Sequence, residues 1–326
     1  MRAVARANAN IALVKYWGKR DVSLNLPAAG SLSVTLEGLS TITEVDFGPS
    51  DGDQLWLDGR LAGEPATRKA LRVVDEVRRR AGLDAPVLIR SRNDFPTGAG
   101  LASSASGLCA LALAASRAAG LELSAAELSA LARRGSGSAC RSVFGGYVEW
   151  RAGERLDGSD SHGVPLFPPG HWELCCLVAV LRSGAKETGS TAGMLQTAVS
   201  SPYQEAFVGG VDDDLGEARQ AIGDRDFGRL ARVAERSCLR MHAAMMASDP
   251  PLLYLLPESW QVIGLVRELR QREGLPVFFT ADAGPNVKVF CEPAAQGAVQ
   301  ARLEAVPGLQ RLIVARPGGG AELVLC

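Results

Sequence analysis

A glycine-rich stretch that runs directly into an apolar helix is the part of this sequence best suited to chemistry. Residues 95–105 read FPTGAGLASSA. A helix N-terminus carries unpaired N–H groups and a partial positive charge, and glycines let the backbone wrap closely around an anion. The stretch therefore predicts a phosphate-binding loop, with an ordinary loop and a serine N-cap as the alternative.

Two other polar segments carry side chains that suit the same chemistry. Residues 134–142 read RGSGSACRS, in which small hydroxyls lie beside Arg134 and Arg141, and arginine can bind a carboxylate or phosphate through two hydrogen bonds. Residues 280–286 read TADAGPN, which places Asp282 on a tight turn after an apolar strand, where a carboxylate can act as a base. A flexible turn and an Asx turn are the respective alternatives.

Two more segments are weaker signals. Residues 184–191 read GAKETGST, which has the glycine spacing of a P-loop, but Ser190 stands where that motif needs its lysine. A P-loop ATPase is therefore excluded, and a hydroxyl-rich loop facing a cleft is the remaining interpretation. Residues 15–21 read KYWGKRD and hold three cations among aromatic side chains. Such clusters usually form a solvated surface, but this one follows an apolar strand directly, so one lysine can point into a cleft.

The elements that must position these segments alternate along the chain. Residues 31–46 alternate polar and apolar side chains, which predicts antiparallel strands, and helical periodicity predicts helices over 66–80 and 101–120, the second apolar all round. Ser124 and Glu127 form a capping box for a helix that stops at Gly135. The other expected elements are strands at 143–150, 172–182, 276–281, 286–291 and 311–316, and helices over 191–247 and 259–271.

Length and composition limit the architecture and the partners. The chain has 326 residues, 47% of them apolar and 22% charged, which is enough to bury one large core or two packed lobes. We expect a mixed α+β chain with two lobes, residues 1–184 and 185–326, and a cleft between them. The net charge of −1 offers no broad basic surface, so nucleic-acid binding is not expected and any anion site needs a local concentration of charge.

Hydropathy and cysteine usage indicate a cytoplasmic protein without a membrane anchor. The longest apolar runs, residues 108–115 and 174–181, have eight residues each, far short of the ~20 that a membrane-spanning helix needs. Seven cysteines without metal-ligand spacing indicate reduced, buried thiols. Three histidines leave little for a histidine metal site or a Ser-His-Asp triad.

Together these segments resemble the GHMP superfamily of small-molecule kinases and, within it, the mevalonate diphosphate decarboxylase family. The stretches KYWGKRD at 15–21 and SGSACRS at 136–142 are specific to this branch. The other matching stretches, in the family's order, are residues 10–14, 24–27, 31–36, 100–107, 143–150, 189–194, 241–243 and 282–286.

The resemblance implies both a fold and a reaction. The fold is an N-terminal α+β lobe with a left-handed βαβ unit, which binds ATP, and a ferredoxin-like C-terminal lobe, usually in a homodimer. The reaction depends on ATP and Mg²⁺ and starts with phosphorylation of the tertiary 3-hydroxyl of (R)-5-diphosphomevalonate. Loss of that phosphate and of CO₂ then yields isopentenyl diphosphate.

The resemblance also implies roles for individual residues. Asp282 matches the catalytic aspartate that accepts or orients the hydroxyl proton, Lys15 the lysine that keeps it ionised, and Arg141 the arginine that holds the substrate carboxylate. Further matches to the substrate site are Tyr16, Trp17, Gly18, Lys19, Ser136, Gly137, Ser138, Ala139, Cys140, Thr191 and Met194. Matches to the ATP site are Asn10, Pro96, Gly98, Gly100, Leu101, Ala102, Ser103 and Ser104, with Ser104 also a candidate Mg²⁺ contact.

The chain departs from the family pattern at two places. Residues 28–31 read AAGS where the family usually has Asn-Ser-Ser after the proline, which reduces the polar groups near the substrate pocket. Ala66 stands where many members place an arginine, with Arg68 and Arg72 a turn or two away. Loss of one diphosphate contact would favour a mevalonate 5-phosphate decarboxylase or a mevalonate 3-kinase. A binding protein of the same fold without catalysis is disfavoured by the presence of Asp282 and Lys15.

Overall fold

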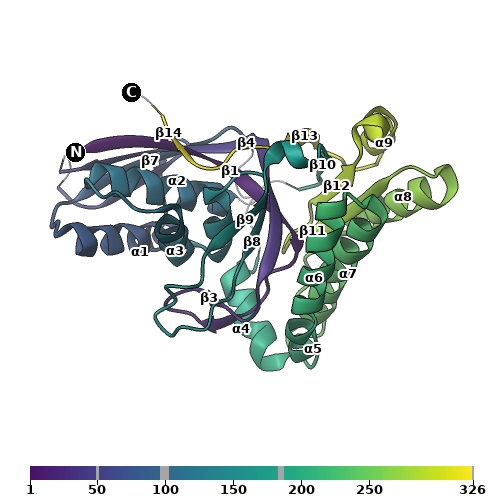
Figure 1. The fold of residues 1–326 in the computed structure, drawn as a ribbon, viewed down its shortest axis with the longest axis horizontal. Helices are drawn as coiled ribbons and strands as arrows, with labels where there is room; N and C mark the ends of the chain where they lie inside the picture. Colours follow the sequence, from purple (N-terminus) through teal and green to yellow (C-terminus); the bar gives the residue numbers. More distant parts are fainter. Residues whose placement is uncertain (49–50, 96–102, 183–186, 325–326) are drawn as a thin grey trace.

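The computed structural model describes residues 1–48, 51–95, 103–182 and 187–324, and they form two lobes that share one sheet (Figure 1). The sheet has twelve strands, and its main path runs β11-β12-β10-β13-β4-β7-β5-β6. Within the described residues, no helix combines the length and the apolar character needed to cross a bilayer. The expected mixed α+β fold with two lobes is confirmed.

The N-terminal lobe is built on two long antiparallel strands, β1 (Arg2–Val14) and β4 (Ser31–Phe47). β4 also pairs with β7 (Val87–Asn93) and with β8 (Tyr147–Trp150). β5 (Gln54–Leu57) lies parallel to β7, and the helix α1 (Glu64–Ala81) connects them. This parallel pair and its helix form the expected βαβ unit.

Helices of the N-terminal lobe cover one face of its sheet (Figure 1). α2 (Ser103–Ala118) is buried on nearly every side, as its continuous apolar sequence predicts, because it lies between the sheet and the helices α1 and α3 (Ala125–Gly135). The predicted capping box opens α3, since the Ser124 amide donates to Glu127 Oε2 over 2.9 Å and the Glu127 amide donates to Ser124 Oγ over 3.3 Å.

The C-terminal lobe has the ferredoxin-like order of four antiparallel strands. β10 (Cys175–Val180), β11 (Val277–Ala281), β12 (Val287–Cys291) and β13 (Arg311–Pro317) lie in the order β11-β12-β10-β13. Among the described residues five helices lie between β10 and β11, the last two being α7 (Phe227–Met246) and α8 (Pro257–Glu273), and α9 (Gln296–Glu304) lies between β12 and β13. This is the βαββαβ connectivity of the ferredoxin-like fold.

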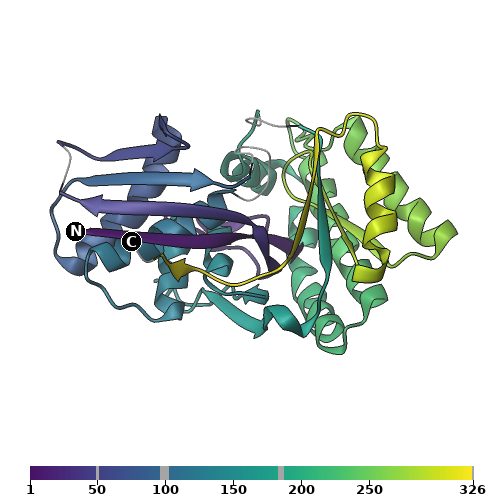
Figure 2. The same cartoon turned by 90° about the horizontal axis from the view of Figure 1, so that it is seen from above.

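The last part of the chain joins the two lobes. β13 continues from the C-terminal sheet to β4, where Arg316 pairs with Glu37. The next strand, β14 (Glu322–Leu323), is antiparallel to β1 and lies beside its first half, where Leu323 pairs with Ala5 (Figure 2). The predicted boundary between residues 184 and 185 lies outside the described residues and stays a prediction, and the strand before it, β10, pairs with β12 and β13.

Two expected elements differ in detail from the structure. Residues 31–46 form part of one continuous strand, β4, rather than several. The expected strand at 143–150 starts only at Tyr147, because residues 137–143 form the 3-10 helix η1 (Gly137–Val143). The remaining elements are β2 (Lys19–Asp21), β3 (Leu26–Pro27), β6 (Arg60–Leu61), β9 (Gly163–Phe167), η2 (Pro169–His171), α4 (Ser190–Ser200), α5 (Gln204–Gly209), α6 (Val211–Asp224) and η3 (Pro293–Ala295).

Candidate active site

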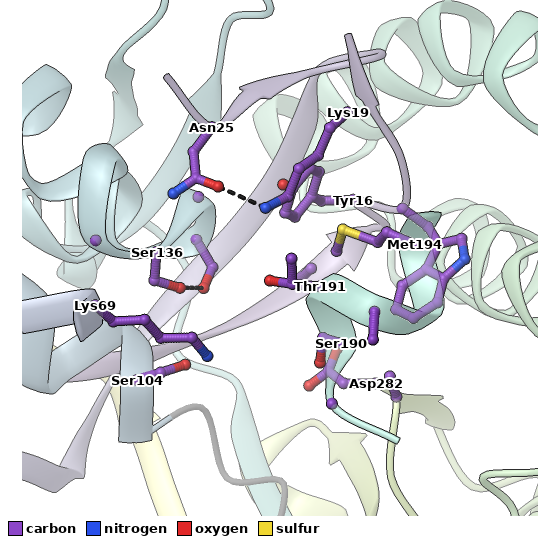
Figure 3. A pocket seen from close by; sticks show the side chains of 18 of the residues that line it. Tyr16, Lys19, Asn25, Lys69, Ser104, Ser136, Ser190, Thr191, Met194 and Asp282 are labelled. Carbon is purple, nitrogen blue, oxygen red and sulfur yellow. Dashed lines mark hydrogen bonds between the residues drawn. The ribbon is translucent and has the colours of Figure 1, made fainter. Parts of the chain in front are cut away.

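A cavity of about 690 Å³ collects side chains from both lobes, and its size is ordinary for a small-molecule site (Figure 3). Among the described residues six basic side chains and one acidic one line it, so positive charge is concentrated here although the whole chain carries −1. The predicted site residues that line the cavity are Asn10, Lys15, Tyr16, Trp17, Lys19, Ser103, Ser104, Ser136, Gly137, Ser138, Arg141, Thr191, Met194 and Asp282.

Lys15 and Asp282 meet at the junction of the lobes. Lys15 follows the last residue of β1, and its amide donates to Ser237 Oγ of α7 over 3.0 Å. Asp282 follows β11, on a turn closed by a 2.7 Å hydrogen bond from the Gly284 amide to the Asp282 carbonyl. The Lys15 ammonium donates to Asp282 Oδ1 over 2.6 Å. The carboxylate is 31% exposed because it faces the cavity, whereas the lysine is 1% exposed.

Asp282 has a second cationic neighbour that sequence analysis did not identify. The Lys288 ammonium, on β12, lies 3.2 Å from Asp282 Oδ2. Burial opposes ionisation of Asp282, but the charges of Lys15 and Lys288 outweigh it and hold the pKa of this carboxyl well below its usual range. Asp282 is therefore a carboxylate throughout the physiological pH range.

Arg141 is a buried cation held by neutral groups. Its Nε donates to Asn10 Oδ1 over 3.1 Å and to Ser33 Oγ over 2.9 Å, and its Nη1 donates to Ser31 Oγ over 2.7 Å. Its guanidinium carbon lies 6.0 Å from the centre of the Trp150 ring. Burial lowers the pKa of Arg141, and no carboxylate within the described part of the chain forms an ion pair with it. A buried guanidinium in a cavity without a counter-ion is suited to an anionic ligand.

Two aromatic residues present unpaired polar atoms at this cavity. The Tyr16 hydroxyl and the Trp17 indole nitrogen are buried and have no hydrogen-bond partner among the described residues. Buried polar groups are normally paired, so both atoms are suited to bind a ligand. Tyr16 packs edge-on against Trp150, with ring centres 4.7 Å apart. Gly137 allows this packing, because a Cβ there would lie 2.7 Å from the Trp150 ring.

A second group of cations comes from one face of α1. Arg68, Lys69 and Arg72 line the cavity, and Figure 3 shows the side chains of Lys19 and Lys69 pointing into it. Lys19 donates to Asn25 Oδ1 over 2.5 Å. Burial, together with the positive charges of Arg72 and Lys69, lowers the pKa of Lys19 to about 8. Arg68 forms an ion pair with Glu64 over 3.1 Å, whereas Lys19, Lys69 and Arg72 destabilise one another until an anion binds among them, which predicts a polyanionic ligand.

Small hydroxyl groups complete the lining. Ser103 and Ser104 occupy the first turn of α2, and Figure 3 shows Ser104 beside the cavity together with Ser136, Ser190 and Thr191. The predicted ATP-site residues Pro96, Gly98, Gly100, Leu101 and Ala102 lie outside the described residues. No group of three or more His, Cys, Asp or Glu side chains that could hold a metal occurs within the described residues.

Three predicted substrate-site residues do not line the cavity formed by the described residues. Ala139 and Cys140 are fully buried in η1, between Ser138 and Arg141, and Ala139 belongs to the apolar core of the N-terminal lobe. Gly18 shapes the loop after Trp17, since its φ of +127° favours glycine and a Cβ there would lie 2.7 Å from Gln204 Nε2. These three residues therefore lie next to lining residues in the chain without lining the cavity themselves.

Lys69 and Lys288 were not among the residues predicted for the site. For Lys69 a signal was present, since Pro65, Arg68, Lys69 and Arg72 share one helical face opposite the apolar face of α1. For Lys288 the only signal was a single lysine within an otherwise apolar strand. Its partner, Asp282, lies on a separate turn that comes close to Lys288 only in the folded chain.

Comparison with known proteins agrees with this geometry. Residues 7–163 match a family model described as a diphosphomevalonate decarboxylase-like N-terminal domain, and residues 176–311 match the mevalonate 5-diphosphate decarboxylase C-terminal domain. The chain is 40% identical to the diphosphomevalonate decarboxylase of Candida albicans over 312 residues, covering 91% of this chain and 86% of that protein.

Solved structures agree over nearly the whole chain. Mevalonate diphosphate decarboxylase from Staphylococcus aureus superposes with a TM-score of 0.93 at 41% identity, covering 99% of this chain and 98% of that one. A structure described as MDDEF in complex with MVAPP, AMPPCP and magnesium gives a TM-score of 0.93 at 41% identity and covers 99% of both chains. Because both family models match and relatives align with the chain along almost its full length, the chain belongs to the diphosphomevalonate decarboxylase family.

Proposed function

We propose that the protein decarboxylates (R)-5-diphosphomevalonate to isopentenyl diphosphate at the expense of ATP. The observation that carries this function is the meeting of Lys15, Asp282 and Arg141 in one cavity, next to a group of cations suited to phosphates. ATP with Mg²⁺ supplies the phosphoryl group that turns the tertiary hydroxyl into a good leaving group.

Asp282 and Lys15 act at the 3-hydroxyl of the substrate. The carboxylate accepts a hydrogen bond from the hydroxyl and orients its oxygen for attack on the phosphoryl group. The lysine charge stabilises the transferring phosphoryl, whose negative charge spreads over its outer oxygens. The low pKa of Asp282 supports a role in orienting the hydroxyl, because such a weak base removes a proton only late in the transfer.

Arg141 holds the carboxylate that leaves as CO₂. Its guanidinium donates hydrogen bonds to Asn10, Ser31 and Ser33 and has no carboxylate partner within the described residues. This supports the role, because the three neutral groups fix its orientation without neutralising its charge. When the C3–O bond breaks, phosphate takes the electron pair and positive charge develops at C3. Cleavage of the C1–C2 bond then supplies the electrons of the C2–C3 double bond and releases CO₂.

The cations around the cavity bind the phosphates. Lys19 and Tyr16 suit the substrate diphosphate, with Ser136 and Ser138 beside them. Arg68 and Arg72 line the cavity within two turns of Ala66, which supports their replacing the arginine that many family members carry there. This supply of charge supports the diphosphate over the monophosphate as the substrate.

The first turn of α2 suits ATP and its metal. Ser103 and Ser104 present hydroxyls at a helix N-terminus, where an anion is stabilised, and Lys69 lines the same cavity. The residues fit a magnesium ion that is held mainly by nucleotide phosphates, with Ser104 as the protein ligand, because Mg²⁺ in such sites takes few ligands from the protein.

A two-product assay tests this function. The protein is incubated with ATP, Mg²⁺ and either mevalonate 5-diphosphate, mevalonate 5-phosphate or mevalonate, and ADP and CO₂ are both measured. Equal amounts of ADP and CO₂, with the highest kcat/KM for the diphosphate, support the proposal. CO₂ from the monophosphate alone would make the protein a mevalonate 5-phosphate decarboxylase, and ADP without CO₂ would make it a mevalonate 3-kinase.

We also propose a cytoplasmic homodimer of the GHMP superfamily. The six cysteines within the described residues are free and buried, which supports a reducing compartment. Size-exclusion chromatography with light scattering measures the assembly, and a mass of about twice the 34.3 kDa of one chain is expected.

A further inference from the structure

Lys288 occupies a position that an apolar residue would normally fill. It lies on β12, between Thr280 of β11 and Val178 of β10, in the interior of the C-terminal sheet. The next residue on the same face, Phe290, stacks on Phe278 with ring centres 5.1 Å apart. Lys288 is 1% exposed, and a buried ammonium is costly unless it is paired.

The pairing partners of Lys288 lie on the turn that carries Asp282. Its ammonium lies 3.2 Å from Asp282 Oδ2 and 3.3 Å from the carbonyl oxygen of Asn286. The Asn286 side chain anchors this turn to β10, because its Oδ1 accepts from the Leu181 amide over 2.7 Å. Lys288 therefore links the position of the Asp282 carboxylate to the rigid centre of the sheet.

The two lysines at Asp282 are not equivalent. Lys15 binds Oδ1 and lines the cavity, whereas Lys288 binds Oδ2 and is absent from the lining formed by the described residues. A phosphoryl group that enters the cavity competes with Asp282 for the Lys15 ammonium. It does not compete for the Lys288 ammonium, because Lys288 does not line the cavity formed by the described residues. One cation is thus available to a ligand while the other stays with the carboxylate.

We propose that Lys288 is a positioning residue that holds the Asp282 carboxylate in place and ionised while Lys15 turns to the transferring phosphoryl group. The inference rests on the proposed role of Asp282 in the decarboxylation. Without Lys288, Lys15 would be the only direct cationic partner of the carboxylate within the part of the chain that the structure describes, and the carboxylate would lose it at the moment of phosphoryl transfer.

The other titratable groups near Asp282 do not carry this function. His242 and Cys238 face it from α7, Cys176 from β10 and Arg141 from η1. Burial, with the charge of Lys15, lowers the pKa of His242 to about 4, and burial raises the pKa of both thiols, so these three groups are neutral near pH 7. Only Arg141 remains as a further cation, and no ion pair joins it to Asp282 within the described residues.

Lys288→Met, Lys288→Arg and the control Phe290→Leu test this role. Phe290 is fully buried on the same face of β12, so its substitution measures the effect of disturbing the packing alone. For Lys288→Met we expect kcat to fall by about 10- to 100-fold, the range for loss of a hydrogen bond to a charged group, with the KM for both substrates within about twofold. Lys288→Arg is expected to retain most of the activity, and Phe290→Leu to lower Tm with kcat nearly unchanged.

The pH profile separates positioning from a structural role. Loss of a cation raises the pKa of Asp282, so the acid limb of the kcat profile moves to higher pH in Lys288→Met and stays in place in Lys288→Arg. In an Asp282→Asn background, Lys288→Met should lower kcat no further. If Lys288→Met lowers Tm but leaves kcat and the acid limb unchanged, or if its effect persists in that background, the positioning role is wrong.

A measurement that needs no turnover tests the role of Lys288 separately from the proposed decarboxylase function. Titration of the Asp282 carboxyl by ¹³C NMR reports its pKa directly, and we expect a higher pKa in Lys288→Met than in the wild type or in Phe290→Leu. An unchanged pKa overturns the role of Lys288 whatever the activity. A protein that turns over none of the mevalonate compounds overturns the proposed function, while the NMR result still decides whether Lys288 controls the carboxylate.

Discussion

Lys15 Nζ lies 2.6 Å from Asp282 Oδ1, although 267 residues separate the two along the chain. The lysine follows the first strand of the N-terminal lobe, and the aspartate follows β11 of the C-terminal lobe. Their ion pair therefore forms only when the lobes are correctly joined.

Asp282→Asn is expected to lower kcat by about 10²- to 10⁴-fold, the usual contribution of a positioned acid–base group. Asp214→Asn is the matched control, because Asp214 is a buried carboxylate that also lies between two cations, 2.7 Å from Arg236 and 3.3 Å from Arg240, and does not line the cavity. Both variants should lose stability. Asp282→Asn removes the carboxylate between two buried lysines, and Asp214→Asn removes the partner of Arg240 and one of the two carboxylate partners of Arg236. Similar losses of kcat in the two variants would contradict a special role for Asp282.

Arg141→Met and Arg133→Met are expected to have opposite effects. Arg141 faces the cavity and has no counter-ion among the described residues, so its substitution should leave Tm unchanged or raise it. The same substitution should lower kcat/KM by about 30-fold or more, because removal of one partner of a buried charge pair costs about 2–5 kcal/mol. Arg133 donates to the carbonyl oxygens of Leu24, Gly158 and Ser161. Its substitution should lower Tm and leave the KM nearly unchanged.

Thermal unfolding and steady-state kinetics of both arginine variants check this pair. A loss of stability in Arg141→Met without ligand would show that the guanidinium has a structural function. A large rise of KM in Arg133→Met would show that this arginine influences the cavity through the loop that it supports.

Tyr16→Phe removes a hydroxyl that has no partner within the described residues. We expect unchanged or higher stability without ligand and a KM for the diphosphate raised by about 5- to 10-fold, equivalent to one hydrogen bond of about 1–1.5 kcal/mol. Tyr147→Phe is the control, because the buried Tyr147 hydroxyl donates to the Trp172 carbonyl over 2.8 Å. That variant should lose about 1 kcal/mol of stability and keep its KM, and the reverse pattern would refute the assignment.

The pH dependence of kcat/KM should be set by the ionisation of Lys19. Its pKa is lowered to about 8, so in the free protein its ammonium is lost as the pH rises through that value, and kcat/KM should decline above pH about 8. In the complex the bound phosphate favours the charged form, so kcat should not show the same limb. Lys19→Arg keeps its charge at these pH values and should abolish the decline in kcat/KM. A decline that persists in Lys19→Arg would assign the limb to another group.

Local sequence patterns were sufficient for most elements and for several site segments. The period of apolar residues predicted α1 and α2, and the Ser124–Glu127 pair predicted the start of α3, because these features depend on residues three or four positions apart. The extra turn of η1 before β8 was not predicted, since the glycine–serine segment at 136–142 has no apolar period of its own.

Most helices and strands, the two-lobed α+β class and the types of residue available for chemistry followed from local patterns in the chain, because neighbouring residues set backbone preference and amphipathic faces. Only the tertiary structure decided that Lys288 binds Asp282, that Lys69 faces the cavity with Arg68 and Arg72, and that Arg141 is held by hydroxyl and amide groups instead of a carboxylate. These contacts join segments far apart in the chain. Their distances depend on how β1, β4 and the C-terminal sheet pack together, which no local pattern encodes.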